Sequence, residues 1–388
     1  MRFEYYSPTK IFFGVDEENK VGSIIKNYGF RKVLLHYGTS SIKSTGLYDK
    51  IVKSLNDSHV NFVELGGVLP NPDITLVRQG IELCKKENID FVLAVGGGSV
   101  IDSAKSICAS VATDVDPLLL TTHKVQVKNA LPLGCVLTIS AAGSELSNSC
   151  VISDRTILLK NGFNSDLVRP LFTIENPMLT YTVSSYQTAC GVVDILMHTL
   201  ERYLTDVDNI SLSNTFALGL MKDVINAGKI VIKDPNNYDA RATLMLASSF
   251  SHNGLTGMGG KMYFTVHKLE HQLSAKHDSI AHGAGLAVLF PAWSKYVYKS
   301  LKTKFLNLSY ELWNIDKRLP EDVAVLRGIE MFEKYFKFLG MPLTLSEFNV
   351  EMDFEKMAND ITNNGTINVP GFVELTKEDV LKIFNSCK

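Results

Sequence analysis

The chain has 388 residues, of which 45% are hydrophobic and 21% charged, and its formal net charge is -2 at pH 7. This length exceeds the size at which one hydrophobic core stops growing, so two domains are expected. The near-neutral charge, without a run of lysine and arginine, argues against nucleic-acid binding, and the longest apolar stretches are too short to span a bilayer.

The first half of the chain alternates short apolar runs with amphipathic stretches. The runs are typical of buried strands, and they cover residues 32–36, 60–65, 91–95 and 134–139. Between them, residues 46–56 and 74–87 show the spacing of amphipathic helices. Strands and helices that alternate in this way predict βαβ units around a parallel sheet.

From residue 186 onward the pattern is almost wholly helical. Long helical stretches are expected at residues 211–232, 239–253 and 319–339, with breaks at Pro235, at 254–260 and at Pro291. The chain therefore divides into a domain of residues 1–180 with a parallel sheet and a helical domain of residues 181–388.

The cysteines and the N-terminus bear on the cellular location. Six cysteines are spread singly without a CxxC pair, and no charged-then-apolar signal segment opens the chain. Both features favour a reducing cytoplasm, with each cysteine a small buried hydrophobic residue rather than part of a disulfide.

A glycine-rich turn follows the strand expected at 91–95. Gly97, Gly98 and Ser99 open the next helix, and free backbone amides at such a position attract anions, so the segment can hold a pyrophosphate. The same pattern also fits an ordinary tight turn, because it is neither GxGxxG nor a Walker motif.

The strand expected at 32–36 ends where sheets of this kind meet a nucleotide ribose. Gly38 stands where a carboxylate would favour NAD(H), while the hydroxyls of Thr39, Ser40 and Ser41 and the cation of Lys43 can accept a 2'-phosphate. NADP(H) is therefore the expected nucleotide, and NAD(H) is the alternative. The non-functional interpretation is a solvated turn whose serines cap the next helix.

Metal-ligand side chains occur in two distant clusters. Asp194 and His198 are four residues apart, so on a helix they share one face, and His267 and His282 follow later. Three imidazoles and a carboxylate suit a divalent ion of the zinc or iron type. A single histidine is more often a satisfied structural residue, so the hypothesis depends on the set. Five of the nine histidines lie in these clusters, namely His198, His267, His271, His277 and His282.

With these motifs, the chain resembles the iron-containing (group III) alcohol dehydrogenases, within them the branch of NADP-dependent butanol dehydrogenases and broad-range aldehyde reductases. The resemblance runs over essentially the whole length. It is carried by SPTKIFFG from Ser7, LPNPD from Leu69, AVGGGSVIDSAK from Ala94, TISAAGSE from Thr138, ENPMLTYT from Glu175, GVVDILMH from Gly191 and the histidine segment that ends at His282. It implies an N-terminal Rossmann-like α/β domain and a C-terminal all-α domain, the dehydroquinate synthase-like fold, with metal and nicotinamide in the cleft between them.

The resemblance also implies roles for single residues. Asp194, His198, His267 and His282 would hold one divalent ion, Fe²⁺ or Zn²⁺, with Ni²⁺ and Co²⁺ as alternatives. His271, beside the metal, and Asp102 are the candidate catalytic residues. The nucleotide groove would be lined by Gly38, Thr39, Ser40, Ser41, Asn71, Gly97, Gly98, Ser99, Asp102, Thr138, Ser144, Lys160 and Leu179.

The expected reaction is hydride transfer between NADP(H) and a small primary alcohol or aldehyde, and a homodimer is expected by analogy. One alternative is a metal-dependent glycerol phosphate dehydrogenase or dehydroquinate synthase-like enzyme of the same fold, which would need extra Lys or Arg for its anionic substrate. Another is a dinucleotide sensor with a closed structural metal. An uncharged substrate is favoured because the sequence neighbours of the ligands are apolar or hydroxylic, namely Ile195, Leu196, Met197, Gly254, Leu255, Met258 and Tyr263.

Overall fold

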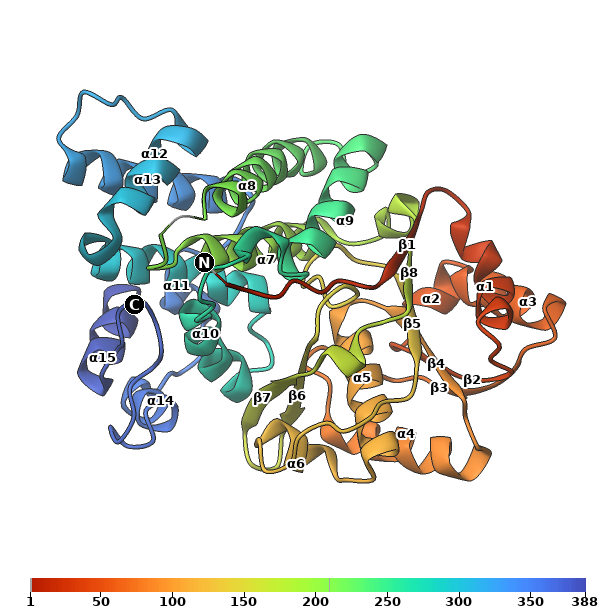
Figure 1. Cartoon of the computed structure of the whole chain (residues 1–388). Coiled ribbons are helices and arrows are strands. Elements are labelled where there is room, and N and C mark those ends of the chain that lie inside the picture. Colours follow the sequence, from red (N-terminus) through yellow and green to blue (C-terminus); the bar gives the residue numbers. More distant parts are fainter. Residues whose placement is uncertain (1, 209) are drawn as a thin grey trace. The chain divides into compact units, whose positions relative to one another are not determined.

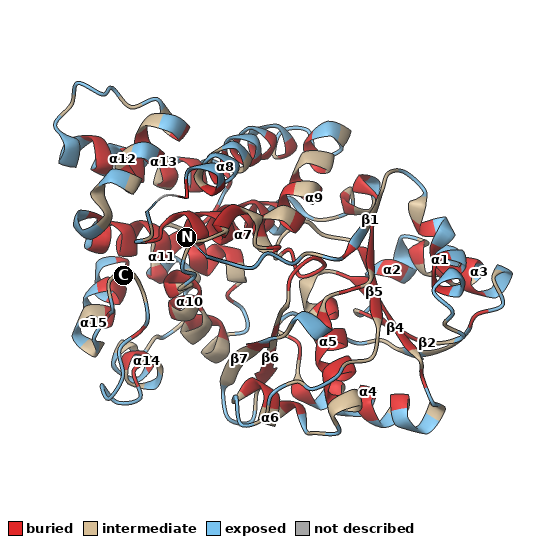
Figure 2. Ribbon diagram, in the orientation of Figure 1, coloured by how far each residue is buried: buried red, intermediate tan, exposed pale blue. Residues whose placement is uncertain are grey.

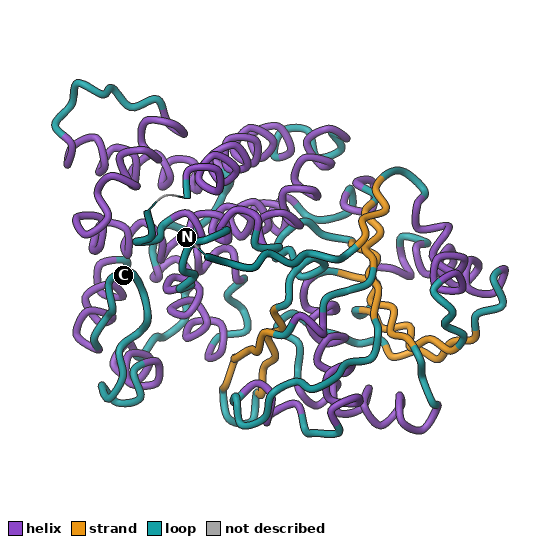
Figure 3. Tube along the Cα trace, viewed as in Figure 1, coloured by secondary structure: helices purple, strands orange, loops and turns teal. Residues whose placement is uncertain are grey.

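The computed structural model describes residues 2–208 and 210–388, which form two compact units (Figure 1). One unit is Tyr6–Val183, and the other combines residues 2–5 with Ser184–Lys388. Figure 3 shows the named strands within the first unit, whereas the second is built from helices. The predicted combination of an α/β part and an all-α part is confirmed. The domain boundary expected from the sequence follows residue 180, and the two compact units divide after Val183.

The first unit is built on a six-stranded parallel sheet with the order β1-β8-β5-β4-β2-β3. Its strands are β1 (Lys10–Phe13), β2 (Lys32–Tyr37), β3 (Asn61–Leu65), β4 (Phe91–Gly96), β5 (Leu133–Leu137) and β8 (Phe172–Glu175), and a separate antiparallel pair is formed by β6 (Ser149–Asp154) and β7 (Leu159–Asn164). Strands β4 and β5 are buried along their whole length. Burial on both faces explains why these strands are continuous apolar runs rather than alternating ones.

Helices cover both faces of this sheet (Figure 1). They are α1 (Val21–Asn27), α2 (Ser41–Ser44), α3 (Leu47–Asp57), α4 (Ile74–Glu87), α5 (Gly98–Thr113) and α6 (Pro117–Thr121), with short 3-10 turns η1 (Glu17–Lys20), η2 (Asp166–Val168) and η3 (Pro177–Thr180). Apolar side chains of α1 and α3 form one core with β2, β4 and β8. Helices α4 and α5 pack against each other, and α5 packs on β4.

The order of the strands defines where a ligand can bind. From β2 the chain first adds β3 on one side and then returns to place β4 on the other side. The loops after β2 and β4 therefore leave in opposite directions, and in open parallel sheets such a switch point is where ligands bind, beyond the carboxyl ends of the strands. The loops at this point begin with Gly38 and Gly97.

The second unit packs its helices around α7 and α11, which Figure 2 shows as mostly buried. Its helices are α7 (Ser185–Tyr203), α8 (Ser211–Val231), α9 (Tyr238–His252), α10 (Thr265–Lys276), α11 (His282–Val297), α12 (Lys302–Trp313), α13 (Glu321–Phe338), α14 (Phe354–Ile361) and α15 (Lys377–Ser386), with 3-10 turns η4 (Leu255–Gly257), η5 (Tyr298–Leu301) and η6 (Leu345–Phe348). Across residues 2–208 and 210–388, none of the helices has both the length and the apolar character needed to cross a membrane.

One predicted helix break is wrong. Pro291 lies inside α11, where we had expected an end. Proline removes one backbone hydrogen bond and crowds the preceding turn, at a cost of about 3 kcal/mol. Here α11 packs against α7, α10, α13 and α15, and Pro291 is itself buried. The tertiary packing outweighs the local penalty.

A buried histidine ties the sheet together. His36 in β2 is fully buried, with Nδ1 2.7 Å from the Leu65 carbonyl oxygen and Nε2 2.9 Å from Ser103 Oγ. The carbonyl requires a proton on Nδ1, and because burial keeps the ring neutral near pH 7, Nε2 accepts from the hydroxyl. Burial lowers the pKa of His36 from its ordinary 6.5 to about 4, although the contact with the Leu65 carbonyl acts in the opposite direction.

Because of His36, we expect the free energy of unfolding of the sheet unit to fall in acid. Because the folded pKa lies below the unfolded one, the stabilisation is complete above about pH 6.5 and is lost as the pH falls toward 4. In urea titrations, His36→Gln is expected to flatten the pH dependence of unfolding in this window by up to about 3 kcal/mol. Equal slopes for both proteins would contradict the assignment.

Candidate functional site

Three helices of the second unit carry the predicted metal ligands. Asp194 and His198 lie one turn apart on α7, His267 lies in the first turn of α10, and His282 is the first residue of α11. Helix α11 packs on both α7 and α10. Ligands far apart in the sequence are thus presented by helices that contact one another.

Three of these four side chains meet at one point. Oδ1 of Asp194 is 3.6 Å from Nε2 of His267 and 3.7 Å from Nε2 of His282, and one ligand atom from each residue lies within 4.8 Å of the other two. His198 is outside this group of three, but its ring centroid is 4.5 Å from that of His267. Its Nδ1 faces the Asp194 carbonyl oxygen at 2.9 Å, which makes Nε2 the atom with the lone pair.

Two atoms at this point are unsatisfied in a way that fits a cation. Oδ1 of Asp194 and Nε2 of His267 are buried and make no hydrogen bond of good geometry to the part of the chain that the structure describes, although Nδ1 of His198 lies 3.1 Å from Oδ1. Buried polar atoms are nearly always paired, so two buried atoms that face each other without a hydrogen bond indicate a missing partner. A divalent ion bound between them would satisfy both, so the residues present fit a metal.

The electrostatics of the cluster favour a charged carboxylate. Burial opposes ionisation of Asp194, but the imidazoles, chiefly His198, hold its pKa well below the ordinary range. Burial lowers the pKa of His198 to about 4 against the pull of Asp194. For His267 burial is outweighed by Glu201 and Asp194, which raise its pKa to about 9. The Asp194 carboxylate is thus ionised and available to a cation.

Glu201 is a functional candidate that we had not predicted. It is buried on α7, its Oε1 accepts from the amide of Val266 at 2.8 Å, and its Oε2 accepts from the amide of His267 at 3.2 Å and from His267 Nδ1. The same carboxylate therefore caps α10 and directs Nε2 of His267 toward Asp194. A sequence signal existed, because Glu201 lies seven residues after Asp194, on the same helix face.

Glu270 has a matching arrangement on α10. Its carboxylate is fully buried and its Oε2 accepts from Nδ1 of His282. It also belongs with His271 and His282 to a second group whose ligand atoms lie within 4.8 Å. The ring centroid of His271 is 5.7 Å from that of His282, whereas His277 caps the far end of α10 outside both groups.

A cationic side chain of α7 close to these ligands is committed to other contacts. Arg202 is buried, donates to the carbonyl oxygens of His198 at 3.0 Å and His252 at 3.5 Å, and lies over the ring of Phe264 at 4.7 Å. These partners hold the guanidinium against the backbone of α7 and α9. It is therefore poorly placed to bind the phosphate of a substrate.

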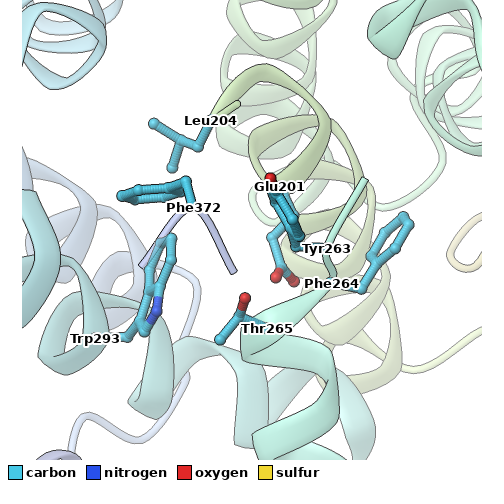
Figure 4. A pocket seen from close by; sticks show the side chains of 7 residues that line it. All are labelled: Glu201, Leu204, Tyr263, Phe264, Thr265, Trp293 and Phe372. Atoms are coloured by element: carbon cyan, nitrogen blue, oxygen red, sulfur yellow. The ribbon is translucent and has the colours of Figure 1, made fainter. Parts of the chain in front are cut away.

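Some residues expected to surround the substrate do not do so. Ile195, Leu196 and Met197 are fully buried in the helical core. They are neighbours of the ligands in the sequence only, so they do not indicate the charge of the substrate. A hollow beside Glu201 has no room for a water molecule and is not a substrate pocket (Figure 4). It is lined by Glu201, Leu204, Tyr263, Phe264, Thr265, Trp293 and Phe372.

Several of the predicted nucleotide residues lie beyond the carboxyl ends of neighbouring strands in the first unit. Gly38, Gly97 and Thr138 follow the neighbouring parallel strands β2, β4 and β5. Residues 39–41 continue from Gly38 into α2, and Gly98 and Ser99 open α5. These segments therefore lie at the switch point of the sheet.

The backbone at the start of α5 is closely packed on one side. A side-chain carbon at Gly97 would lie 2.3 Å from Cγ2 of Ile139, and one at Gly98 would lie 3.1 Å from Cβ of Ala142. Glycine is therefore required at position 97, and α5 presents the amides of its first turn beside these residues. Such a terminus is a suitable place for a pyrophosphate.

The remaining predicted residues take different places. Asn71 lies between β3 and α4 with a φ of 54°, Lys160 pairs with Ser153 in the β6–β7 hairpin, and Leu179 lies in η3 after β8. Asp102 accepts from the Ser144 hydroxyl and, at 3.0 Å, from the amide of Val151. Burial raises the pKa of Asp102 despite the charge of Lys105. Both carboxylate oxygens of Asp102 thus contact residues 144–151, and the catalytic role expected for Asp102 stays a prediction.

Two family descriptions match the chain in succession. The iron-containing alcohol dehydrogenase domain matches residues 8–177, and the C-terminal domain of the Fe-containing alcohol dehydrogenase family matches residues 188–387. Together they cover nearly the whole sequence.

Individual proteins are similar over the same length. NADH-dependent butanol dehydrogenase A of Clostridium acetobutylicum is 39% identical, with 99% of each chain covered. The Escherichia coli NADPH-dependent aldehyde reductase YqhD is 35% identical, with 90% of this chain and 89% of the reductase covered. The crystal structure of NADH-dependent butanol dehydrogenase A from Thermotoga maritima superposes with a TM-score of 0.95 at 36% identity, over 100% of this chain and 98% of that one.

Proposed function

The chain belongs to the iron-containing alcohol dehydrogenase family, and from this premise we propose that it transfers a hydride between NADP(H) and a small primary alcohol or aldehyde. Its relatives are named as butanol dehydrogenases and as an aldehyde reductase, which supports this substrate class. The observation that carries the proposal is the pair of buried, unsatisfied ligand atoms on Asp194 and His267.

We propose that Asp194, His198, His267 and His282 hold one divalent ion, Fe²⁺ or Zn²⁺, with Ni²⁺ and Co²⁺ as alternatives. When bound, such an ion polarises the oxygen of an aldehyde as a Lewis acid. Glu201 and Glu270 orient the two imidazoles that they contact.

His271 is the candidate for proton transfer near the substrate oxygen. It lies one turn from His267 on α10, and its ring centroid is 5.7 Å from that of His282. An imidazole can hold a proton near neutral pH and release it to an alkoxide as the alcohol forms.

The nucleotide preference is proposed from the residues after β2. Nζ of Lys43 lies 5.2 Å from the ring centroid of Tyr37 and 4.7 Å from that of Tyr48. Both tyrosine hydroxyls donate to the carboxylate of Glu64, at 2.8 and 2.6 Å. Burial opposes ionisation of Glu64, but the two phenols and Lys43 lower its pKa, so the carboxylate stays charged. The rings hold the Lys43 ammonium two residues after Ser41, where it can offset this negative charge and offer a cation to a phosphate. This arrangement supports binding of a 2'-phosphate.

Lys43→Met is expected to weaken NADPH binding about tenfold, the loss typical of one charged contact to phosphate, and to leave NADH binding within about twofold. Fluorescence titration at one fixed salt concentration measures both dissociation constants. Lys53→Met, which removes an exposed lysine of α3 paired with Asp57, is the matched control. An equal loss for both nucleotides, or tighter binding of NADH than of NADPH by the unaltered protein, would contradict the preference.

We propose an uncharged substrate because Arg202 is bonded to main-chain carbonyls. An enzyme for glycerone phosphate needs free cations to bind the phosphate. Turnover of butanal and of glycerone phosphate, followed by NADPH absorbance, compares the two alternatives. The proposal requires butanal to be reduced with the higher kcat/KM. Preference for glycerone phosphate would favour the phosphate-specific alternative, and no oxidation of NADPH with either would favour a sensor.

A further inference from the structure

A fully buried lysine lies in the sheet unit, outside the residues assigned above. Lys105 is on α5 with no exposed surface. Its ammonium is surrounded by oxygens of one loop. They are the carbonyl oxygens of Ser144 (2.6 Å), Ser147 (2.9 Å) and Ser149 (2.7 Å) and the hydroxyls of Ser144 and Ser147, each at 3.1 Å.

This arrangement is that of a cation enclosed by oxygen ligands. Burying an ammonium is costly unless hydrogen bonds replace its hydration, and the loop supplies them almost alone. If the loop moved away, the charge would remain in an apolar interior. Lys105 therefore links the conformation of residues 144–149 to α5.

The same loop is attached to α5 at a second point. Oδ1 of Asp102 accepts from the Ser144 hydroxyl, Oδ2 accepts from the amide of Val151 at 3.0 Å, and the Asp102 carbonyl oxygen accepts from the Cys150 thiol at 3.2 Å. Asp102 and Lys105 are three residues apart and share one face of α5. Together they hold residues 144–151 along the first turns of this helix.

The held segment lies against the start of α5. A side-chain carbon on Gly98 would be 3.1 Å from Cβ of Ala142 and 4.0 Å from Cβ of Ser144. A shift of the loop of about 1 Å would therefore change the space beside the first amides of α5, where a pyrophosphate is proposed to bind.

We propose that Lys105 is a positioning residue for the dinucleotide, whose ammonium holds the 144–149 loop as a wall of the anion site at the start of α5. This inference rests on the proposed function, since it assumes that a dinucleotide binds there. It assigns to the buried charge a role in affinity for the nucleotide, beyond stability of the fold.

Lys105→Met keeps the length of the side chain and removes the charge. The dissociation constant for NADPH is expected to rise about 10- to 100-fold, the effect of a displacement of about 1 Å in a binding site. The KM for NADPH should rise in parallel, with kcat at saturating NADPH changed less than about threefold. The bound metal per chain should remain as in the unaltered protein.

Two further variants separate positioning from stability. Ser54→Ala removes buried hydrogen bonds to Gly22 and Asn19 in the same unit, away from the 144–149 loop, and should lower stability to urea without changing NADPH affinity. Ser147→Ala removes one hydroxyl near Lys105 and should weaken NADPH binding by about two- to fivefold, as for one neutral hydrogen bond. If Lys105→Met does not fold, Ser147→Ala decides the question.

The outcomes distinguish this inference from the proposed function. If the unaltered protein binds neither NADPH nor NADH, the proposed function fails. If it binds nucleotide and the folded Lys105→Met protein, or Ser147→Ala in its place, retains its affinity, the positioning role is overturned. A loss of affinity in Ser54→Ala as large as that in Lys105→Met would also overturn it, because affinity would then follow stability alone.

Discussion

His267→Ala is expected to abolish metal binding and to reduce turnover at least about a thousandfold, because stabilisation of a developing charge by a metal supplies several kcal/mol and each 1.36 kcal/mol is tenfold in rate. His267 contributes Nε2, which faces Asp194 Oδ1 at 3.6 Å without a hydrogen-bond partner in the described chain. Elemental analysis of the purified variant measures the metal, and NADPH absorbance with butanal measures turnover.

NADPH affinity distinguishes this loss from unfolding. The nucleotide residues belong to the other compact unit, so the dissociation constant for NADPH should change little in His267→Ala. His277→Ala is the matched control, since it removes a histidine at the end of the same helix, outside both ligand groups. Normal metal content and turnover in His267→Ala would exclude the proposed ligand set.

Glu201→Gln is expected to weaken metal binding about 10- to 100-fold, the usual cost of losing a carboxylate that orients a ligating histidine. The glutamine keeps the shape of the side chain and one acceptor for the start of α10, but it loses the charge next to His267 Nδ1. A competition titration with a chelator of known affinity measures the metal dissociation constant. Turnover should return when the metal is supplied in excess.

The control for Glu201→Gln is a second buried glutamate. Glu18→Gln alters a carboxylate that is paired with Lys50 at 2.8 Å and with Asn176 at 3.0 Å in the sheet unit. It should lower stability without changing metal affinity. Unaltered metal affinity in Glu201→Gln would show that the position of His267 does not depend on this carboxylate.

Local signals in the sequence predicted the central elements, and long-range packing determined those that were missed. Strands β2, β3, β4 and β5 are short apolar runs bounded by turns, which a single sequence displays. The hairpin of β6 and β7 has no such run, because polar residues interrupt both strands, and β8 has only four residues. Pro291 shows the same limit, because its place inside α11 depends on the helices around it.

The candidate site was also predicted only in part from local sequence signals. The spacing of Asp194 and His198 identifies one helix face, because a helix repeats every 3.6 residues. Nothing local indicates that His282 comes within 3.7 Å of Asp194, since that distance depends on how α11 packs on α7. The sequence offered only the ligand chemistry of the four side chains, and the family resemblance assigned them to one ion. Glu201 and Glu270 were missed because an acidic residue on a helix is ordinarily solvated, and only burial reveals their role.

Metal titration of chelator-treated protein tests the central claim most directly. After exhaustive chelation, NADPH-dependent reduction of butanal should fall to background, and Zn²⁺ or Fe²⁺ should restore it with a break at one equivalent per chain. The four ligands Asp194, His198, His267 and His282 offer a single site, so no second equivalent should be needed. Full turnover by protein shown to be free of metal would contradict the account.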